Sequence, residues 1–202
     1  MRTLLIGPPG SGKGTQGSLL SVALGVPTIS TGDLFREHVR QGTALGREVE
    51  KVLADGGYVP DDITNSMIEG RLAAADTEQG FILDGYPRTR GQVEELDGVL
   101  ASRALRLDAV VNLSVAADEL EARLTLRGSR GGRADDRVGA IRGRIAIYEE
   151  VTVPLLDIYR ERGIVIDADG RGDPTAVAAG LVRTLRNLTA TSAEPRKAGG
   201  SR

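Results

Sequence analysis

The residues of this chain that point most directly to chemistry are the glycines and the lysine of residues 7–15, Gly-Pro-Pro-Gly-Ser-Gly-Lys-Gly-Thr. A loop of this kind between a strand and a helix directs several backbone N–H groups at one spot and forms a cradle for phosphate. Lys13 adds a positive charge that reaches the outer phosphates of a nucleoside triphosphate. The spacing Gly7-x-x-x-x-Gly12-Lys13 fits a phosphate-binding loop, but Gly14 stands where Ser or Thr usually supplies a hydroxyl to Mg²⁺, and Thr15 follows one residue later.

Two other segments place charged residues directly after apolar runs. Residues 81–84 are Phe-Ile-Leu-Asp, so Asp84 is expected at the carboxyl end of a buried strand, where an acid can meet the hydration shell of a nucleotide-bound metal ion. The alternative is that Asp84 caps the helix after Pro87. Arg88 follows at the same edge, and Arg36 lies one turn into the helix after a Ser-Thr-Gly-Asp segment that contains a helix cap. These two arginines indicate a second anion site.

A third group of arginines lies further along the chain. Arg123 and Arg127 are one helical turn apart and share a helix face, and Arg144 lies on the next helix. Between them, residues 128–136 form an arginine- and glycine-rich loop. The alternative is a flexible basic surface loop. Because the glycines and a serine supply hinges, we interpret this segment as a lid that closes over a triphosphate.

Strands and helices must alternate to position these residues. Apolar runs predict strands at residues 3–6, 26–29, 81–83, 109–113 and 164–166. Helical patterns lie between and after them, at residues 16–24, 34–40, 45–54, 61–75, 91–101, 118–127, 138–162 and 174–187. This alternation predicts an α/β fold with a five-stranded parallel sheet and helices on both faces. Ligands of such sheets bind beyond the carboxyl ends of the strands, where each motif above falls.

The length of 202 residues suits one domain, which we place at residues 1–188. Two interruptions of the alternation, at about 30–60 and about 127–137, are expected to be flaps over the site without a core of their own. The polar, glycine-containing tail at 189–202 is expected to be disordered. No apolar run is long enough to span a membrane and no leader precedes the first strand, which indicates a cytoplasmic protein.

Composition excludes several kinds of chemistry. The chain has no cysteine, so disulfides, thiolate catalysis and cysteine-bound zinc are excluded. His38, the one histidine, lies on a polar helix, which makes histidine acid–base catalysis unpromising. A net charge of −2 gives no reason to expect nucleic acid as a partner. Phosphoryl transfer to another phosphate fits this inventory, because the attacking oxygen is already ionised and positioned Arg, Lys and Mg²⁺ stabilise the transition state.

Together these motifs resemble the nucleoside monophosphate kinases, and most closely the adenylate kinases with a short lid. The resemblance covers about residues 1–188 and includes the Gly-Tyr-Val-Pro-Asp segment at 57–61 and the Arg-Ala-Asp-Asp segment at 133–136. It implies a phosphate-binding-loop (P-loop) nucleoside triphosphate hydrolase-like fold, with a monophosphate-binding flap at about 30–60 and a short lid at about 127–137. It also implies a cis peptide before Pro87. The chain departs from the pattern in Arg137-Val138-Gly139 and in extra loop residues at 129–132.

The resemblance implies reversible transfer of a phosphoryl group from ATP to AMP, giving two ADP, in a monomer that uses Mg²⁺ and no zinc. Asp84 would reach the nucleotide-bound Mg²⁺ through water, with no direct protein ligand. The implied ATP-binding residues are Gly10, Ser11, Gly12, Lys13, Gly14, Thr15, Arg123 and Arg127. The implied AMP-binding residues are Thr31, Arg36, Tyr58, Val59, Gly85, Arg88, Gln92, Arg133 and Arg144. The residues implied to act in catalysis are Lys13, Asp84, Arg88, Arg127, Arg133 and Arg144.

Three other functions stay open at this stage. A pyrimidine monophosphate kinase for UMP or CMP would share the fold, although Thr31 and Thr89 favour adenine within this family. A nucleotide-binding module or slow switch would have no use for a second anion site or for the lid arginines. A kinase that acts on a sugar-like hydroxyl would need a base, and no carboxylate beyond Asp33 and Asp84 presents itself.

Overall fold

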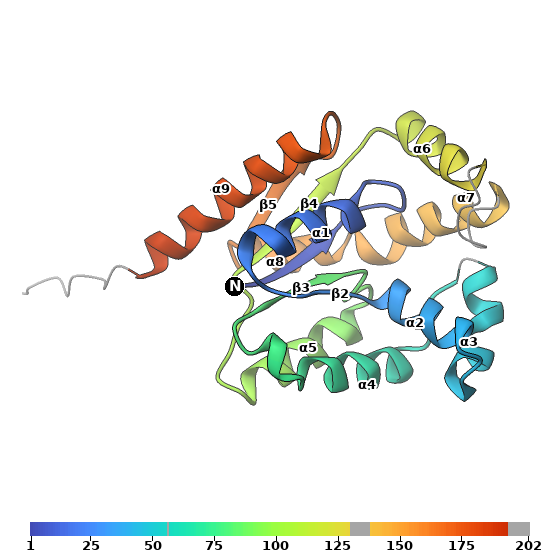
Figure 1. Ribbon diagram of the computed structural model, residues 1–202, viewed down its shortest axis with the longest axis horizontal. Helices are drawn as coiled ribbons and strands as arrows, with labels where there is room; N and C mark the ends of the chain where they lie inside the picture. Colours follow the sequence, from blue (N-terminus) through green and yellow to red (C-terminus); the bar gives the residue numbers. More distant parts are fainter. Residues whose placement is uncertain (56, 130–137, 194–202) are drawn as a thin grey trace, which may run out of the picture.

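The computed structural model describes residues 1–55, 57–129 and 138–193. Its centre is a parallel sheet of five strands in the order β2-β3-β1-β4-β5 (Figure 1). The apolar runs of the sequence form these strands because a parallel sheet is covered on both faces. The strands are β1 (Arg2–Ile6), β2 (Thr28–Ser30), β3 (Phe81–Asp84), β4 (Ala109–Ser114) and β5 (Val165–Asp169). The predicted fold class is confirmed.

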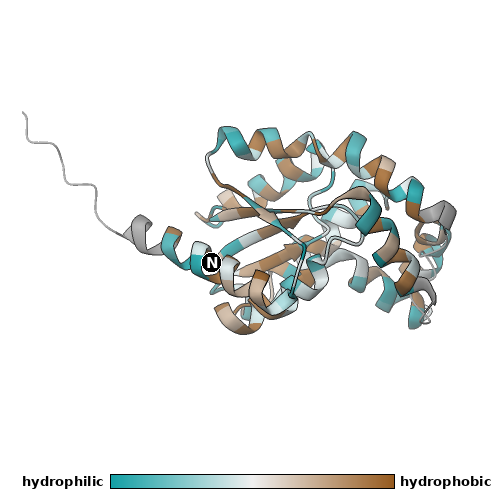
Figure 2. Cartoon of the chain, turned by 90° about the horizontal axis from the view of Figure 1, so that it is seen from above, coloured by the Kyte–Doolittle hydropathy of each residue, from teal (hydrophilic) through white to brown (hydrophobic). Residues whose placement is uncertain are grey.

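Apolar side chains from alternate strand residues pack against helices on opposite faces of the sheet. On one face, Leu4, Leu83 and Val110 join a cluster completed by α4 (Asp61–Leu72), α5 (Arg90–Ala101) and α8 (Leu155–Glu161). On the other face, Leu5 and Val111 pack against α1 (Lys13–Leu24) and α9 (Pro174–Ala193). Figure 2 shows the hydrophobic residues concentrated on the strands, between the helical layers. The sheet is thereby held rigid beneath the loops at its carboxyl edge.

The insertion between β2 and β3 contains α2 (Thr31–Arg40), α3 (Ala44–Ala54), α4 and a short 3₁₀ helix (Ala75–Thr77). Phe35, Val49 and Val59 are buried in a small apolar cluster of this segment, separate from the two sheet-facing clusters. The insertion thus has apolar contacts of its own, while Ile68 and Leu72 of α4 pack in the sheet-facing cluster. Figure 1 shows α2 and α3 toward the same end of the molecule as α6 (Ala117–Ser129) and α7 (Val138–Ile147).

Two helices begin earlier than the sequence pattern predicts. The first helix starts at Lys13, because Gly12 adopts a φ of 97° that a residue with a side chain rarely takes and so turns the loop directly into the helix. The second starts at Thr31, because the side chain of Ser30 accepts a hydrogen bond from the Asp33 amide and caps it. The cap expected in this segment is thus Ser30.

The single long helix predicted at residues 138–162 is wrong. It divides into α7, a π-helical turn (Tyr148–Thr152) and α8. Pro154 is the physical reason, because proline has no N–H and its ring collides with the carbonyl four residues before it. The chain accommodates it by widening the preceding turn, where the Val153 amide donates to the Tyr148 carbonyl five residues back, at 2.9 Å.

Helix α9 extends to Ala193, so the prediction of a disordered tail is wrong for residues 189–193, which are helical. The remainder of that tail, 194–202, and residues 130–137 of the predicted lid lie outside the described residues. No helix of the part that the structure describes is both long and apolar enough to cross a membrane. The peptide bond between Tyr86 and Pro87 is cis, as expected.

Candidate active site

The loop after β1 forms an open anion cradle at the carboxyl edge of the sheet. Gly10 and Gly12 have φ values of 85° and 97°, which only glycine adopts readily. At Gly7 a Cβ atom would lie 2.5 Å from the Leu113 carbonyl oxygen, so only glycine fits there. No side chain of residues 1–55, 57–129 or 138–193 caps the first turn of α1. Its amide groups and the positive end of the helix dipole are therefore available to an anion.

Lys13 and Asp84 bring opposite charges to this loop. The Lys13 ammonium donates to the carbonyl oxygens of Gly7 and Pro8, at 2.7 and 3.0 Å, so it lies against the loop rather than extending into solvent. A Cβ atom at Gly14 would lie 3.9 Å from the Asp84 carboxylate, which places this acid beside the first turn of α1. The helix after Pro87 is capped by Thr89 instead, so the alternative role of Asp84 as its cap is wrong.

A cleft of about 730 Å³ collects most of the predicted site residues. It extends from the phosphate-binding loop to the end of β5 and to the first residue of α9. The predicted residues that line it are Gly10, Ser11, Gly12, Lys13, Gly14, Thr15, Arg36, Asp84, Gly85, Arg88, Arg123, Arg127 and Arg144. Residues from five separate segments of the chain thus converge on one site.

A smaller cavity of about 50 Å³ adjoins this cleft. The predicted residues that line it are Thr31, Arg36, Tyr58, Val59, Gly85, Arg88, Gln92 and Arg144. Arg36, Arg88 and Arg144 line both hollows and therefore stand between them. Two compartments that share a wall of three guanidinium groups suit two anionic reactants that must meet. Arg133, predicted in both the AMP-binding and the catalytic sets, lies outside the described residues.

An ion pair orients the Arg36 side chain, and backbone and aromatic contacts orient that of Arg88. The Arg36 guanidinium pairs with Asp33 at 2.5 Å and folds back over Gly32, where a Cβ atom would lie 2.9 Å from it. Arg88 donates from Nε to the Gly85 carbonyl at 2.7 Å. Its guanidinium carbon also lies 4.7 Å from the centre of the Tyr58 ring, within cation–π distance. Both arginines are thus directed into the site by contacts of the protein itself.

The side-chain amide of Gln92 is held in one orientation. Its oxygen accepts from the Arg88 amide at 2.7 Å, and its nitrogen donates to the Asp61 carboxylate, also at 2.7 Å. The other carboxylate oxygen of Asp61 accepts from the Thr89 hydroxyl at 2.6 Å. Since an amide has a second N–H and a second oxygen lone pair, one donor and one acceptor remain for a ligand. Sequence reasoning assigned no role to Asp61, whose only signal was its place in the family-like segment 57–61.

Two buried tyrosines near the site stay protonated at neutral pH. Burial raises the pKa of Tyr148 to about 12, and burial likewise raises the pKa of Tyr86 above its ordinary value. The Tyr86 hydroxyl donates to the Asn65 side-chain oxygen at 2.8 Å. Neither hydroxyl is therefore suited to remove a proton from a substrate.

Arg123 and Gly170 tie the phosphate-binding loop to the end of β5. The Arg123 guanidinium contacts Glu119 at 2.5 Å, the Gly170 carbonyl at 3.0 Å and the Ser11 carbonyl at 3.5 Å. At Gly170 a Cβ atom would lie 2.9 Å from the Ser11 carbonyl oxygen and 2.8 Å from Val115. Sequence reasoning missed Gly170, because the need for a glycine arises only from this close approach of two distant loops.

If ATP binds in the larger cleft and AMP in the smaller cavity, as the resemblance implies, a Gly170→Ala variant is expected to raise the KM for ATP by about tenfold, because an extra methyl group in a packed site costs ~1–3 kcal/mol and displaces the loop. The KM for AMP should then change little, since Gly170 does not line the smaller cavity. Steady-state kinetics with each nucleotide varied in turn measure both constants. Gly180→Ala is the matched control, because nothing lies within 4 Å of a Cβ atom there. An unchanged KM for ATP in Gly170→Ala would contradict this coupling.

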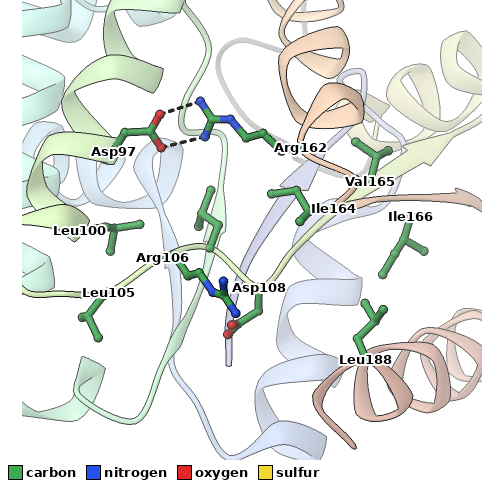
Figure 3. Close-up of a pocket in the computed structure, with 12 residues that line it drawn as sticks. Asp97, Leu100, Leu105, Arg106, Asp108, Arg162, Ile164, Val165, Ile166 and Leu188 are labelled. Atoms are coloured by element: carbon green, nitrogen blue, oxygen red, sulfur yellow. Dashed lines mark hydrogen bonds and ion pairs between the residues drawn. The ribbon is translucent and has the colours of Figure 1, made fainter. Parts of the chain in front are cut away.

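Another large hollow, also of about 730 Å³, lies at the opposite edge of the sheet, near the amino ends of β4 and β5 (Figure 3). Arg162 donates to both carboxylate oxygens of Asp97 there, at 2.9 and 2.6 Å, so its charge is already balanced. The rest of the lining is largely leucine, isoleucine and valine. None of the predicted site residues that the structure describes lines it, so it is distinct from the candidate active site.

The chain is similar to known proteins along most of its length. A family model described as adenylate kinase matches residues 5–164. A protein named adenylate kinase from Leifsonia xyli subsp. xyli is 47% identical over 182 residues, which are 90% of this chain and 92% of that protein. A protein of the same name from Nocardioides sp. is 47% identical over 92% of this chain and 97% of its own. Another, from Stenotrophomonas maltophilia, is 44% identical over 92% of this chain and 100% of its own.

Proposed function

This chain belongs to the adenylate kinase family and is an ATP:AMP phosphotransferase, and from that premise we propose that the larger cleft holds ATP while AMP binds against the residues of the smaller cavity, which at about 50 Å³ must widen to admit a nucleotide. The observation that carries the proposal is the shared wall of Arg36, Arg88 and Arg144. Transfer requires two highly charged reactants to approach each other, and guanidinium groups that face both compartments lower the repulsion between them. The same groups can stabilise charge on the transferring phosphoryl group.

In the ATP compartment, backbone amides and positively charged side chains both contact the nucleotide. The loop amides at Gly10, Ser11, Gly12, Gly14 and Thr15 bind the triphosphate, and Lys13 neutralises its outer phosphates. Arg123 lies against the adenine end of the cleft, where it also holds Gly170. Arg127, on the next turn of α6, joins Arg144 at the transferring group.

The AMP compartment matches adenosine monophosphate by charge at one end and by hydrogen bonding at the other. Arg36 and Arg88 bind the phosphate, and Thr31, Tyr58, Val59 and Gly85 surround the nucleoside. The fixed amide of Gln92 presents an acceptor beside a donor. Adenine offers the complementary pair, an N6 amino group beside the N1 acceptor. Uracil and guanine present a carbonyl beside an N–H, so the amide would have to rotate against both the Arg88 amide and Asp61.

The reaction proceeds without a general base. The attacking atom is an oxygen of the AMP phosphate, which is ionised near neutral pH, so no side chain needs to remove a proton. The described residues supply what remains, which is alignment of the two phosphates by Arg88 and Lys13 and charge stabilisation by the arginines.

The donor set of the cleft fits a magnesium ion brought by the nucleotide. Among the described residues, no group of three or more His, Cys, Asp or Glu side chains could hold a metal by itself. Asp84 and Thr15 nevertheless both line the cleft beside the loop, and oxygen ligands are what Mg²⁺ prefers. Asp84 would hold a water of the ion, and the bound ion would neutralise phosphate charge.

We also propose a monomer that works in the cytoplasm, without nucleic-acid partners. The large apolar side chains exposed in the described part of the chain are Val22, Leu126, Val153 and Leu188. They are distributed over separate elements of the fold rather than gathered in one patch, which supports the monomer.

A coupled assay of ADP formation from Mg·ATP, with AMP, CMP, UMP and GMP offered separately, tests the proposal. AMP should be used best, and UMP and GMP should be slower by about 10²–10⁴-fold, because a mismatched base leaves the buried Gln92 amide unpaired. CMP should fall between them, since cytosine has the adenine-like pair on a smaller ring. A preference for UMP would contradict the assignment of Gln92, and turnover independent of any monophosphate would contradict the two-compartment site.

A further inference from the structure

The π-helical turn before Pro154 brings Thr152 to the AMP side of the site. Thr152 is 4% exposed, although it belongs to a helical segment with exposed neighbours. One extra residue in a helical turn rotates the residues around it by about 100°, the angle between successive residues of an α-helix. Thr152 therefore reaches two groups of the site, the Arg88 backbone and the Tyr58 side chain.

The hydrogen bonds of Thr152 can be assigned in direction. Its hydroxyl lies 3.1 Å from the Arg88 carbonyl oxygen and 3.0 Å from the Tyr58 hydroxyl. A threonine hydroxyl has one proton, and a carbonyl oxygen can only accept. Thr152 therefore donates to Arg88, and Tyr58 donates to Thr152. The two bonds form a chain from the flap segment, through the π-turn, to the backbone that carries Arg88.

Tyr58 completes a closed arrangement around Arg88. The face of its ring lies 4.7 Å from the Arg88 guanidinium carbon, so the same side chain that donates to Thr152 also supports the charged end of Arg88. Arg88 is thus held at its carbonyl by Thr152, at Nε by Gly85 and at its guanidinium face by Tyr58. None of these contacts uses a guanidinium N–H₂ group, so with respect to the described residues both terminal nitrogens stay available for a phosphate.

We propose that Thr152 is a positioning residue, which fixes Tyr58 and the Arg88 backbone so that the guanidinium is aimed at the AMP phosphate before AMP arrives. The proposal rests on the assignment of the smaller cavity to AMP. Preorganisation of this kind increases affinity, because a side chain that is already ordered loses less conformational freedom on binding. Thr152 lines a small hollow that borders both Arg88 and Lys13, and it lines neither the larger cleft nor the smaller cavity itself. Its effect should fall mainly on AMP because its hydrogen-bond partners, Tyr58 and Arg88, both line the smaller cavity, and Tyr58 does not line the larger cleft.

The test is a kinetic comparison of Thr152→Val with the wild-type protein. Valine keeps the shape and removes both hydrogen bonds, so the KM for AMP should rise about 3- to 10-fold, the effect of losing one or two such bonds. The KM for ATP should stay within about twofold, and Thr152→Ser should restore AMP binding because it keeps the hydroxyl. Tyr58→Phe should reproduce part of the loss, and adding it to Thr152→Val should cause little further change, because both remove the same bond.

Thr77→Val is the matched control, because Thr77 is also buried and donates to backbone carbonyls, those of Leu72 and Ala74, far from the site. It should lower the melting temperature without changing either KM. Equal changes in both KM values, or an unchanged KM for AMP in Thr152→Val, would overturn the proposal. Failure of the wild-type protein to use AMP would instead overturn the assignment of the cavity, so the two failures are distinguishable. Circular dichroism of each variant establishes that it is folded.

Discussion

A Lys13→Met variant is expected to lose at least ~10²–10³-fold in kcat, the effect of removing one preorganised charged donor from a transition state. The ammonium lies against the carbonyls of Gly7 and Pro8, inside the loop that cradles the phosphates, so the variant loses the positive charge that this loop holds. Methionine has nearly the same length and helix propensity as lysine. The melting temperature should therefore shift by less than about 4 °C. Coupled kinetics and a thermal melt measure the two quantities.

Lys51→Met provides the control for the loss of a lysine charge. Lys51 is exposed on α3 and lines neither compartment of the site. Its turnover should match that of the wild type. If Lys13→Met retained more than about a tenth of the wild-type kcat, the charge at this position would not be acting on the transferring group, since 1.4 kcal/mol corresponds to a factor of ten.

An Arg88→Ala variant is expected to raise the KM for AMP and lower kcat much more than it weakens the binding of ATP. The guanidinium lines both compartments and is held between Tyr58 and the Gly85 carbonyl. Its removal takes away a charge-assisted contact to the acceptor phosphate and leaves negative charge unscreened where the reactants meet. The KM for AMP should rise about 10²-fold and kcat should fall by a similar factor. The Kd for ATP, measured by calorimetry in the absence of AMP, should change less than about threefold.

Arg162→Ala is a closely matched control. Arg162 also lies over a tyrosine ring, that of Tyr159, at 5.1 Å, and it also has a polar partner, in Asp97. It lies at the opposite edge of the sheet, so its removal should affect stability and leave both nucleotide constants unchanged. If Arg88→Ala left the AMP kinetics unaltered, the assignment of the second compartment would be wrong.

Local sequence patterns predicted the elements of this fold well, because apolar periodicity reports burial and burial decides which segments become strands. The five strands are present, and parallel pairing follows from the helices between them. Their spatial order could not be predicted in the same way. The placement of β1 between β3 and β4 depends on contacts between residues about eighty positions apart or more, such as Leu5 opposite Asp84.

The errors in the predicted helices lie at a break in one helix and at the end of another. The division of the predicted helix at 138–162 follows from Pro154, but the sequence pattern does not reveal whether a helix accommodates proline by a break, a kink or a π-turn. The continuation of α9 to Ala193 was missed because small and polar residues in 189–193 give a weak signal for a helix. Most residues differ in helix propensity by only ~0–0.7 kcal/mol. The residue at which a helix ends therefore depends on small differences in free energy that a sequence pattern does not reveal.

The candidate site was predicted to different depths for different residues. Lys13, Arg36 and Arg88 could be predicted because a charged residue type or a motif can be recognised from the sequence alone, and all three line the cleft. Asp61 and Thr152 were not found, because each acts through a neighbour that is distant in sequence and carries no signature alone. The structure reveals the roles of Asp61 and Thr152, because it shows their hydrogen bonds to Gln92 and Arg88.

The central position of β1 separates the site into two halves that different parts of the chain build. On the proposed assignment, elements that follow β2 and β3 form the acceptor side, with Thr31, Arg36, Arg88 and Gln92, whereas the loop after β1 and the elements that follow β4 and β5 form the donor side, with Lys13 and Arg123. An engineer who wished to change the accepted base could therefore redesign the acceptor half as a module. Changes at Thr31 or Gln92, which line only the smaller cavity, should add to changes on the donor side, whereas changes at the arginines that line both compartments should not.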